Sequence, residues 1–139
     1  MRKLLCVILS VVMVLATSVC GFGAVKPDDQ VVKPQYITTD SVDSRVSISN
    51  GTASYYARFE PKTGSSVSYV KATLKLVNSS GTVVKTKTET IYKTGGYFKI
   101  SDSKALSSKG TYHAEYTLKV YKSGSLVETI KGQSETAKY

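Results

Sequence analysis

Lysines and tyrosines are the side chains of this chain whose type and spacing favour a binding role. In segment 67–77, Lys71 and Lys75 alternate with apolar residues, and in segment 112–121 Lys119 and Tyr121 occupy equivalent alternating positions. Alternation with a period of two places such residues on one face of a β-strand, opposite the apolar face. A sheet face that combines cations with aromatic rings can hold an anionic wall polymer, a glycan or a protein partner.

The predicted ligand-binding face therefore consists of Lys71, Lys75, Lys119 and Tyr121. The alternative interpretation is a solvated face, on which lysines maintain solubility and tyrosines are ordinary strand residues. Three more lysines are expected to share this face, and two more tyrosines are expected to be partly exposed: Lys85, Lys87 and Lys131, and Tyr56 and Tyr69.

The sequence offers little catalytic chemistry. His113 is the only histidine, and both cysteines, Cys6 and Cys20, lie near the N-terminus. A nucleophilic triad or a metal site needs further groups gathered around such a histidine. The acidic residues are scattered, so local spacing sets no carboxylate pair, and no segment has the alternating oxygen donors of a calcium loop. We therefore expect a protein without a catalytic site, metal or cofactor.

Segment 1–24 has the layout of a secretory signal peptide. Arg2 and Lys3 precede an apolar run at 4–15, and small residues follow as far as Ala24. The run is short for a membrane span, so we expect a secreted protein, either extracellular or associated with the cell envelope. An uncleaved N-terminal anchor is one alternative. Lipidation at Cys20 is a less favoured one, because Val19 stands where a lipobox has Gly, Ala or Ser.

Removal of that signal would leave a basic domain without cysteine. The chain has 19 basic and 10 acidic residues, and loss of Arg2 and Lys3 leaves 17 and 10, a net charge of +7. Export without disulfides fits a bacterial protein better than a small animal ectodomain. The positive charge favours anionic partners. Nucleic acid is not an expected partner, because the protein is predicted to be exported.

The remaining chain divides into a lead-in and one domain. Segment 25–40 is predicted to be extended, because Val-Lys-Pro occurs in it twice and proline pushes the preceding residue toward extended geometry. Segment 41–139 is rich in Thr, Ser, Val and Tyr and has no helical periodicity. It predicts an all-β, seven-stranded antiparallel β-sandwich. The expected strands lie near 45–49, 52–60, 67–77, 82–92, 97–101, from 112 and from 126.

The start of the sixth expected strand resembles immunoglobulin and fibronectin type III domains. Leu106, followed by Gly110-Thr111-Tyr112-His113-Ala114, is similar to the leucine–glycine–tyrosine signature at their E–F corner. The resemblance implies that the Tyr112 hydroxyl hydrogen-bonds back across this corner. Ala114 stands where disulfide-bonded immunoglobulin domains have a cysteine, and the chain has no tryptophan. The likeness is therefore one of architecture.

That architecture implies a place for two similar hairpins. Segment 73–86 recurs as segment 117–129 with one loop residue missing. The strands would then share one sheet in the order 82–92, 67–77, 112–121 and 126 onward. On its inner face, Leu74 and Leu76 would lie beside Leu118 and Val120 and would face the other three strands.

Three further runs, at 48–53, 65–68 and 110–112, resemble small secreted proteins of Firmicutes. Those proteins have one Ser/Thr/Tyr-rich β-sandwich behind a signal peptide and are mostly domains of unknown function. The likeness implies fold and export, and it carries over no functional residue. The sequence thus predicts a secreted, non-catalytic binding or surface-interaction module. The alternatives are a structural or accessory envelope protein without a specific ligand, and a hydrolase or inhibitor whose site the sequence does not show.

Overall fold

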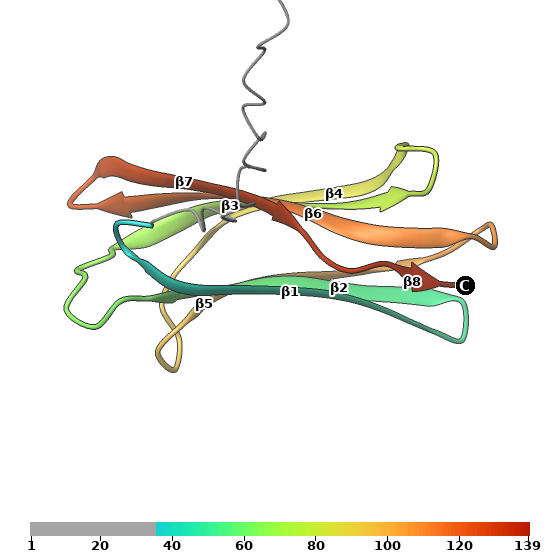
Figure 1. Ribbon diagram of the computed structural model, residues 1–139, viewed down its shortest axis with the longest axis horizontal. Coiled ribbons are helices and arrows are strands. Elements are labelled where there is room, and N and C mark those ends of the chain that lie inside the picture. The colour runs from blue at the N-terminus through green and yellow to red at the C-terminus, as the bar shows by residue number, and fades with distance from the viewer. Residues whose placement is uncertain (1–35) are drawn as a thin grey trace, which may run out of the picture. The chain divides into compact units, whose positions relative to one another are not determined.

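The computed structural model describes residues 36–139, and this part of the chain consists of antiparallel strands and loops without a helix. Figure 1 shows the strands in two facing layers. The all-β, antiparallel prediction is thereby confirmed. The predicted signal peptide, Cys20 and most of the predicted lead-in lie outside the described residues. The strands are β1 (Thr39–Ser49), β2 (Thr52–Pro61), β3 (Tyr69–Asn78), β4 (Val83–Ile91), β5 (Phe98–Ala105), β6 (Thr111–Lys122), β7 (Ser125–Gln133) and β8 (Ala137–Lys138).

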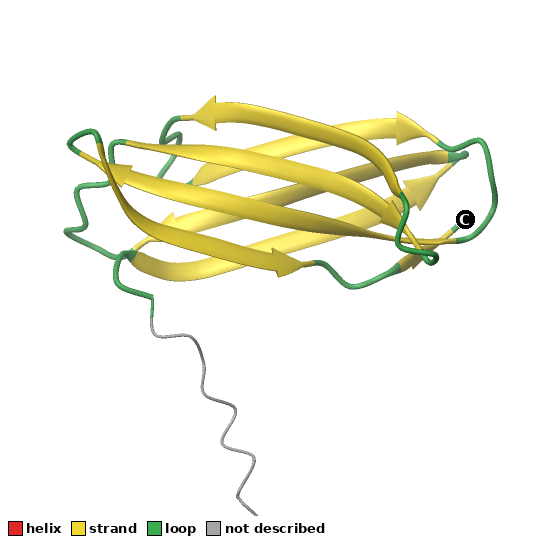
Figure 2. Cartoon of the chain, turned by 90° about the horizontal axis from the view of Figure 1, so that it is seen from above, coloured by secondary structure: helices red, strands yellow, loops and turns green. Residues whose placement is uncertain are grey.

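The strands form a small and a large sheet. The small sheet has the order β1-β2-β5, and the large sheet has the order β4-β3-β6-β7, with β8 pairing with β6 as well. The two similar hairpins, β3–β4 and β6–β7, therefore lie side by side with β3 against β6, as predicted. In Figure 2 the strands of both sheets run lengthwise and cross at a shallow angle, which is the aligned mode of sheet packing.

The structure has eight strands where the sequence predicted seven. The last expected strand divides at Ser134, whose backbone N–H donates to the Ala114 carbonyl at 2.8 Å. The Ser134 hydroxyl oxygen accepts from the Ala114 N–H at 2.9 Å, so a side chain replaces one backbone partner at this point. The two-residue β8 is too short to produce a visible alternation in the sequence.

Two tight turns set the register of the hairpins. Asn50 and Gly51 join β1 to β2 with φ of 48° and 73°, and Ser123 and Gly124 join β6 to β7 with φ of 49° and 82°. Positive φ at both positions is the requirement of a type I′ turn, whose twist matches that of the flanking strands. Once the register is set, the pleat assigns every side chain to one face of its sheet.

The inner faces of the two sheets meet in one apolar core. Leu74, Leu76, Leu118 and Val120 are fully buried in it, as predicted, and each contributes about 1.5–3 kcal/mol by leaving water. From the small sheet the core receives mainly aromatic and aliphatic side chains of β2 and β5. These include Tyr55, Ala57, Phe59, Phe98 and Ile100, with the Phe59 and Phe98 ring centroids 5.5 Å apart.

Two strands of the small sheet are longer than predicted. β1 begins at Thr39, six residues before its expected start, and β5 continues to Ala105, four residues past its expected end. The added residues are mostly polar and lack apolar alternation. They are nevertheless strands because β2 offers backbone partners along its whole length, from Thr52 to Pro61.

The tyrosine contact implied by the resemblance is present. The Tyr112 hydroxyl donates a 2.7 Å hydrogen bond to the backbone carbonyl of Ser108. Tyr112 is 5 % exposed, and this bond satisfies its hydroxyl within the corner that leads into β6.

Candidate ligand-binding face

The register of the large sheet arranges its outward side chains in rows across the strands. Tyr69 pairs with Tyr121, and two residues further along β3, Lys71 pairs with Lys119. The intervening Val70 and Val120 are buried, so these pairs point away from the core. We name two of the rows. The tyrosine row is Tyr92, Tyr69, Tyr121 and Leu126, and the lysine row is Thr90, Lys71, Lys119 and Thr129.

All four predicted site residues lie on this outer face. Lys71 and Lys119 occupy the lysine row, Tyr121 the tyrosine row, and Lys75 a position opposite Glu115. Lys131 lies there as well, opposite Thr117. Two strands that are distant in sequence thus bring the predicted residues together.

The tyrosine row is an exposed aromatic ridge at one end of the sheet. The Tyr69 and Tyr121 rings stack with centroids 4.8 Å apart and planes inclined by 14°. The Tyr92 ring packs against the Tyr69 ring, with ring centroids 6.4 Å apart and ring planes inclined by 52°. Tyr92 is 67 % exposed and Leu126 is 51 % exposed. The row therefore offers apolar surface to a ligand while its central ring is held on both sides.

The lysine row carries positive charge that no carboxylate neutralises. Between residues 36 and 139, none of Lys71, Lys75, Lys119 and Lys131 takes part in an ion pair. The Lys71 Nζ lies 5.2 Å from the centroid of the Tyr121 ring, a cation–π contact that leaves its charge in place. Outside the two rows, Glu115 lies on the same face opposite Lys75, and its carboxylate is 3.6 Å from His113 Nε2.

A shallow hollow of about 410 Å³ lies beside the lysine row. Its floor includes Thr73 and Thr117, which are cross-strand partners, because their short side chains leave room between longer neighbours. The Thr73 hydroxyl is within 3.2 Å of the Thr88 hydroxyl. The rim carries charged and amide groups from Lys75, Glu115, Lys131 and Gln133. The hollow thus combines hydroxyl groups with cations.

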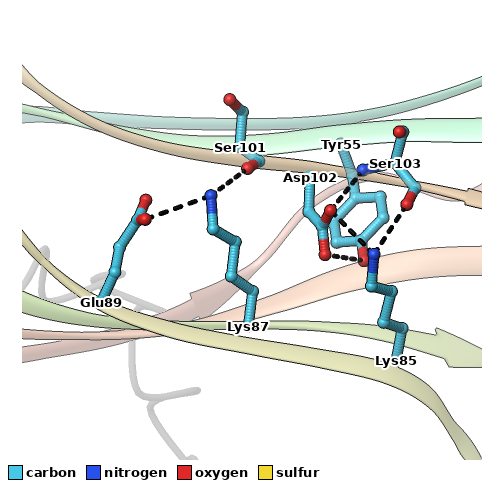
Figure 3. A network of polar contacts seen from close by, with 7 residues as sticks. All are labelled: Tyr55, Lys85, Lys87, Glu89, Ser101, Asp102 and Ser103. Carbon is cyan, nitrogen blue, oxygen red and sulfur yellow. Dashed lines mark hydrogen bonds and ion pairs between the residues drawn. The ribbon is translucent and has the colours of Figure 1, made fainter.

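Lys85 and Lys87 were expected on this face, and that prediction is wrong. Their cross-strand partners are the buried Leu76 and Leu74, so both lysines point toward the other sheet. Figure 3 shows them reaching from β4 to the backbone of β5. Lys85 Nζ donates to the Asp102 carboxylate at 2.9 Å and to the Ser103 carbonyl at 3.0 Å. These lysines close one edge of the sandwich.

Asp102 is the centre of that network. Its carboxylate also accepts hydrogen bonds from the Tyr55 hydroxyl at 3.3 Å and from the Ser103 N–H at 2.8 Å. Burial acts to raise the pKa of Asp102, but the bonds from Lys85 and Ser103 outweigh it and hold that pKa below its ordinary value. Burial and the neighbouring Asp102 charge raise the pKa of Tyr55, so its hydroxyl stays protonated and remains a donor. Lys87 supports the edge by donating to the Ser101 carbonyl at 2.9 Å.

Glu128 fastens the opposite edge. Its carboxylate accepts from the Ile37 and Thr38 N–H groups at 2.9 and 3.2 Å, and from the Thr38 and Thr39 hydroxyls at 2.5 and 2.8 Å. Burial acts to raise the pKa of Glu128, and these four bonds lower it below its ordinary value. β7 is thereby tied to the start of β1.

The outer face of the small sheet differs because its charges are largely matched. Arg58 forms an ion pair with Glu60 and lies 4.3 Å from the Tyr97 ring centroid. The Tyr56 hydroxyl donates to the Asp43 carboxylate at 2.7 Å, and Lys99 Nζ lies 4.7 Å from the Tyr56 ring centroid. Two carboxylates thus lie among the cations of this face, so it provides a natural control for the large sheet.

Sequence reasoning missed Tyr92, Asp102 and Glu128. Tyr92 continues the alternation of Thr86, Thr88 and Thr90, so counting back from an inward Ile91 would have placed it on the outer face. Asp102 lies beyond the expected end of its strand, and Glu128 acts on backbone groups some 90 residues away. No local pattern identifies either contact.

No protein-family model matches the chain, and no curated protein is significantly similar to it. The described residues contain no helix that could cross a membrane. They also contain no cluster of three or more His, Cys, Asp or Glu side chains suited to a metal ion. The chemistry of the outer face is therefore the available guide to function.

Proposed function

We propose that this chain is a secreted, non-catalytic binding module that holds an anionic polymer of the cell envelope on the outer face of its large sheet. The observation that carries the proposal is the gathering of Lys71, Lys75, Lys119 and Lys131 on one face without an ion pair within the described domain. Charges kept unpaired on one surface create a positive potential that concentrates an anionic partner there.

Two features of this face suit a polymer better than a small anion. The lysines are spread over β3, β6 and β7, and the hollow between them is shallow and open. A small anion would reach only one or two ammonium groups and would remain mostly hydrated. A chain with repeated charges can contact several of them at once, and linked weak contacts add up to useful avidity.

The scaffold that presents this face is proposed to be of immunoglobulin or fibronectin type III type. The strand order of both sheets and the Tyr112 bond to Ser108 support this assignment. The signal-like segment 1–24 and the lack of cysteine after Cys20 support export into the envelope or the medium. Such domains serve many functions, so the function rests on the face and not on the fold.

The test is binding of the secreted protein to immobilised polyphosphate, to polygalacturonate and to purified bacterial cell walls at low and high salt. Charge reversal of Lys75→Glu with Lys119→Glu should weaken binding about 100-fold or more, because two attractive contacts become repulsive. The matched control is Arg45→Glu with Lys99→Glu on the small sheet, which has the same change in net charge and should bind nearly as the parent does. Binding by the parent should also weaken steeply with salt.

Equal losses in the two double variants would show that net charge, and not this face, governs binding. If the parent protein binds none of the three materials, the proposal is wrong. A structural or accessory envelope role without a specific ligand would then be favoured.

A further inference from the structure

We infer that the tyrosine row is a stacking site for sugar rings, and that with the lysine row it selects an acidic polysaccharide whose sugars carry carboxylates. This inference rests on the proposed function, because it names the class of anionic polymer that the same face would hold. It adds a second kind of contact, apolar and ring-shaped, to the electrostatic one.

Tyr92 is the contact residue of this site. Its ring is 67 % exposed, yet it does not stand alone, since it leans on Tyr69 at 6.4 Å. Tyr69 is itself stacked on Tyr121 at 4.8 Å. A tyrosine braced in this way offers a large, rigid, amphipathic surface that loses little conformational entropy when a ligand covers it. The C–H face of a sugar ring is a surface that such a ring can cover.

The row has the dimensions of a short stretch of polymer. It crosses four adjacent strand positions, from Tyr92 beyond the end of β4 to Leu126 on β7. At about 4.8 Å between strands it is about 14 Å long. Leu126, half exposed, extends the apolar surface at the far end. A ligand with several rings in succession would cover the row better than a single ring would.

The lysine row lies where the charged groups of such a chain would fall. Lys71 and Lys119 lie two residues along their strands from Tyr69 and Tyr121, a separation of about 7 Å. The contact of Lys71 Nζ with the Tyr121 ring joins the two rows. When a sugar ring stacks on the tyrosine row, a neighbouring ammonium group can donate a charge-assisted hydrogen bond to a carboxylate that this sugar carries.

The threonines behind the lysines complete the match to a sugar chain. Thr73, Thr88 and Thr117 lie across adjacent strands of this face, and a hydroxyl can both donate to and accept from the hydroxyls of a sugar. A polyphosphate chain has no apolar ring to cover Tyr92 and Leu126, and it does not need hydroxyl partners. The combination of rings, ammonium groups and hydroxyls therefore favours an acidic polysaccharide over a phosphate polymer.

The experiment compares three probes: polygalacturonate with acidic rings, dextran with neutral rings, and polyphosphate with charge but no rings. Polygalacturonate should bind most tightly. Tyr92→Ala should weaken its binding about tenfold, the loss expected for an aromatic contact residue, and should leave polyphosphate binding within about twofold of the parent. The chain has no tryptophan and ten tyrosines, so the part of a probe-induced change in tyrosine fluorescence that Tyr92→Ala removes reports on this row.

Tyr56→Ala is the matched control. Tyr56 lies under Lys99 on the small sheet much as Tyr121 lies beside Lys71 on the large one, and its loss should leave all binding unchanged. Tyr92 lies outside every strand and is mostly exposed, so its replacement leaves the fold intact, as a thermal melt will show.

The outcomes separate the two proposals. Equal binding of polygalacturonate and polyphosphate, with neither affected by Tyr92→Ala, overturns the stacking site and leaves the proposed function standing. Dextran binding as tight as that of polygalacturonate overturns the carboxylate requirement. Failure of both anionic probes to bind, with cell walls also unbound, removes the proposed function itself.

Discussion

The lysines of β4 and those of the neighbouring strands form two groups that differ in what their ammonium groups contact. Lys85 and Lys87 point inward and donate to Asp102, Ser101 and Ser103 on β5. The outward lysines of β3, β6 and β7 contact no carboxylate within the described domain. Both groups lie in one sheet and have the same chemistry. Their roles differ because the pleat of the sheet turns them to opposite sides.

This difference shows why a count of lysines says little about a surface. The ammonium group of an inward lysine at the sheet edge is already bonded within the fold, so its charge is not available to a ligand. An outward lysine without a carboxylate neighbour contributes little to stability, since it has no partner, and its charge is available to a ligand. The comparison therefore predicts that substitutions in the inward group change mainly stability, whereas substitutions in the outward group change mainly binding and alter stability only slightly.

Asp102→Ala should produce the largest loss of stability. It removes three hydrogen bonds at a carboxylate whose side chain is 16 % exposed. The Tyr55 hydroxyl and the Ser103 N–H lose their bonds to Asp102, and Lys85 keeps only its bond to the Ser103 carbonyl. We expect the free energy of unfolding to fall by about 2–3 kcal/mol, measured by chemical denaturation, while affinity for polygalacturonate stays unchanged.

Asp43→Ala is the matched control for that loss. Asp43 accepts a hydrogen bond from Tyr56, which follows Tyr55 on β2, but this site is exposed. Removal of the Asp43 carboxylate should therefore lower the free energy of unfolding by about 0.5 kcal/mol or less. A cost at Asp43 as large as that at Asp102 would contradict the view that the β4–β5 edge is structural. A loss of polygalacturonate binding in Asp102→Ala would contradict the separation of the two lysine groups.

Acidification should weaken both edges of the sandwich by a smaller amount. The pKa values of Asp102 and Glu128 are lowered in the folded state, so the unfolded chain binds protons more readily. Their stabilising contribution is complete above the ordinary values of 3.8 and 4.5, and it is lost as pH falls through the lower folded values. The effect is smaller than that of Asp102→Ala because a protonated carboxyl group still accepts hydrogen bonds.

Melting temperature measured from pH 6 down to about pH 2 checks this expectation. The parent protein should lose stability in the acid part of the range. Asp102→Asn should show a shallower decline, because one of the two titrating groups is gone. A parallel decline in the variant, or a parent whose melting temperature rises on acidification, would show that Asp102 does not contribute through its charge.

The placement of the four candidate residues could be predicted because its signals are local, and the order of the large sheet could be predicted because the resemblance implies a known architecture. In β3 and β6 the apolar residues alternate without interruption, so Lys71, Lys75 and Lys119 could be assigned to one face. Pairing of the two hairpins followed from the strand order of the immunoglobulin-like sandwich that the resemblance implies. The assignment of side chains to faces uses only periodicity and turn residues.

The side of the sheet to which Lys85 and Lys87 point could not be predicted, because the strand has a bulge at Val84. The register between β3 and β4 shifts there, because Leu76 pairs with Lys85 and Val77 pairs with Val83. A bulge of this kind adds one residue and reverses the alternation beyond it. Counting from Val84 places the lysines outward, whereas counting back from the buried Ile91 places them inward. The sequence allows both counts.

Lys119→Glu has the smallest predicted effect on stability. It should raise the free energy of unfolding, and it tests the outward group most directly. Lys119 lies opposite Lys71 in the antiparallel pair, and like charges in this arrangement repel. Its replacement by glutamate turns repulsion into attraction, so the free energy of unfolding should rise by about 0.5 kcal/mol while polygalacturonate binding weakens.

Lys75→Glu makes the same charge change opposite Glu115, and there it should lower stability by a similar amount. Chemical denaturation of the two variants decides the matter. Opposite signs would mean that the lysine row is maintained at a cost to the fold, as expected of a binding face, whereas equal signs would mean that cross-strand neighbours do not set the stability of this face.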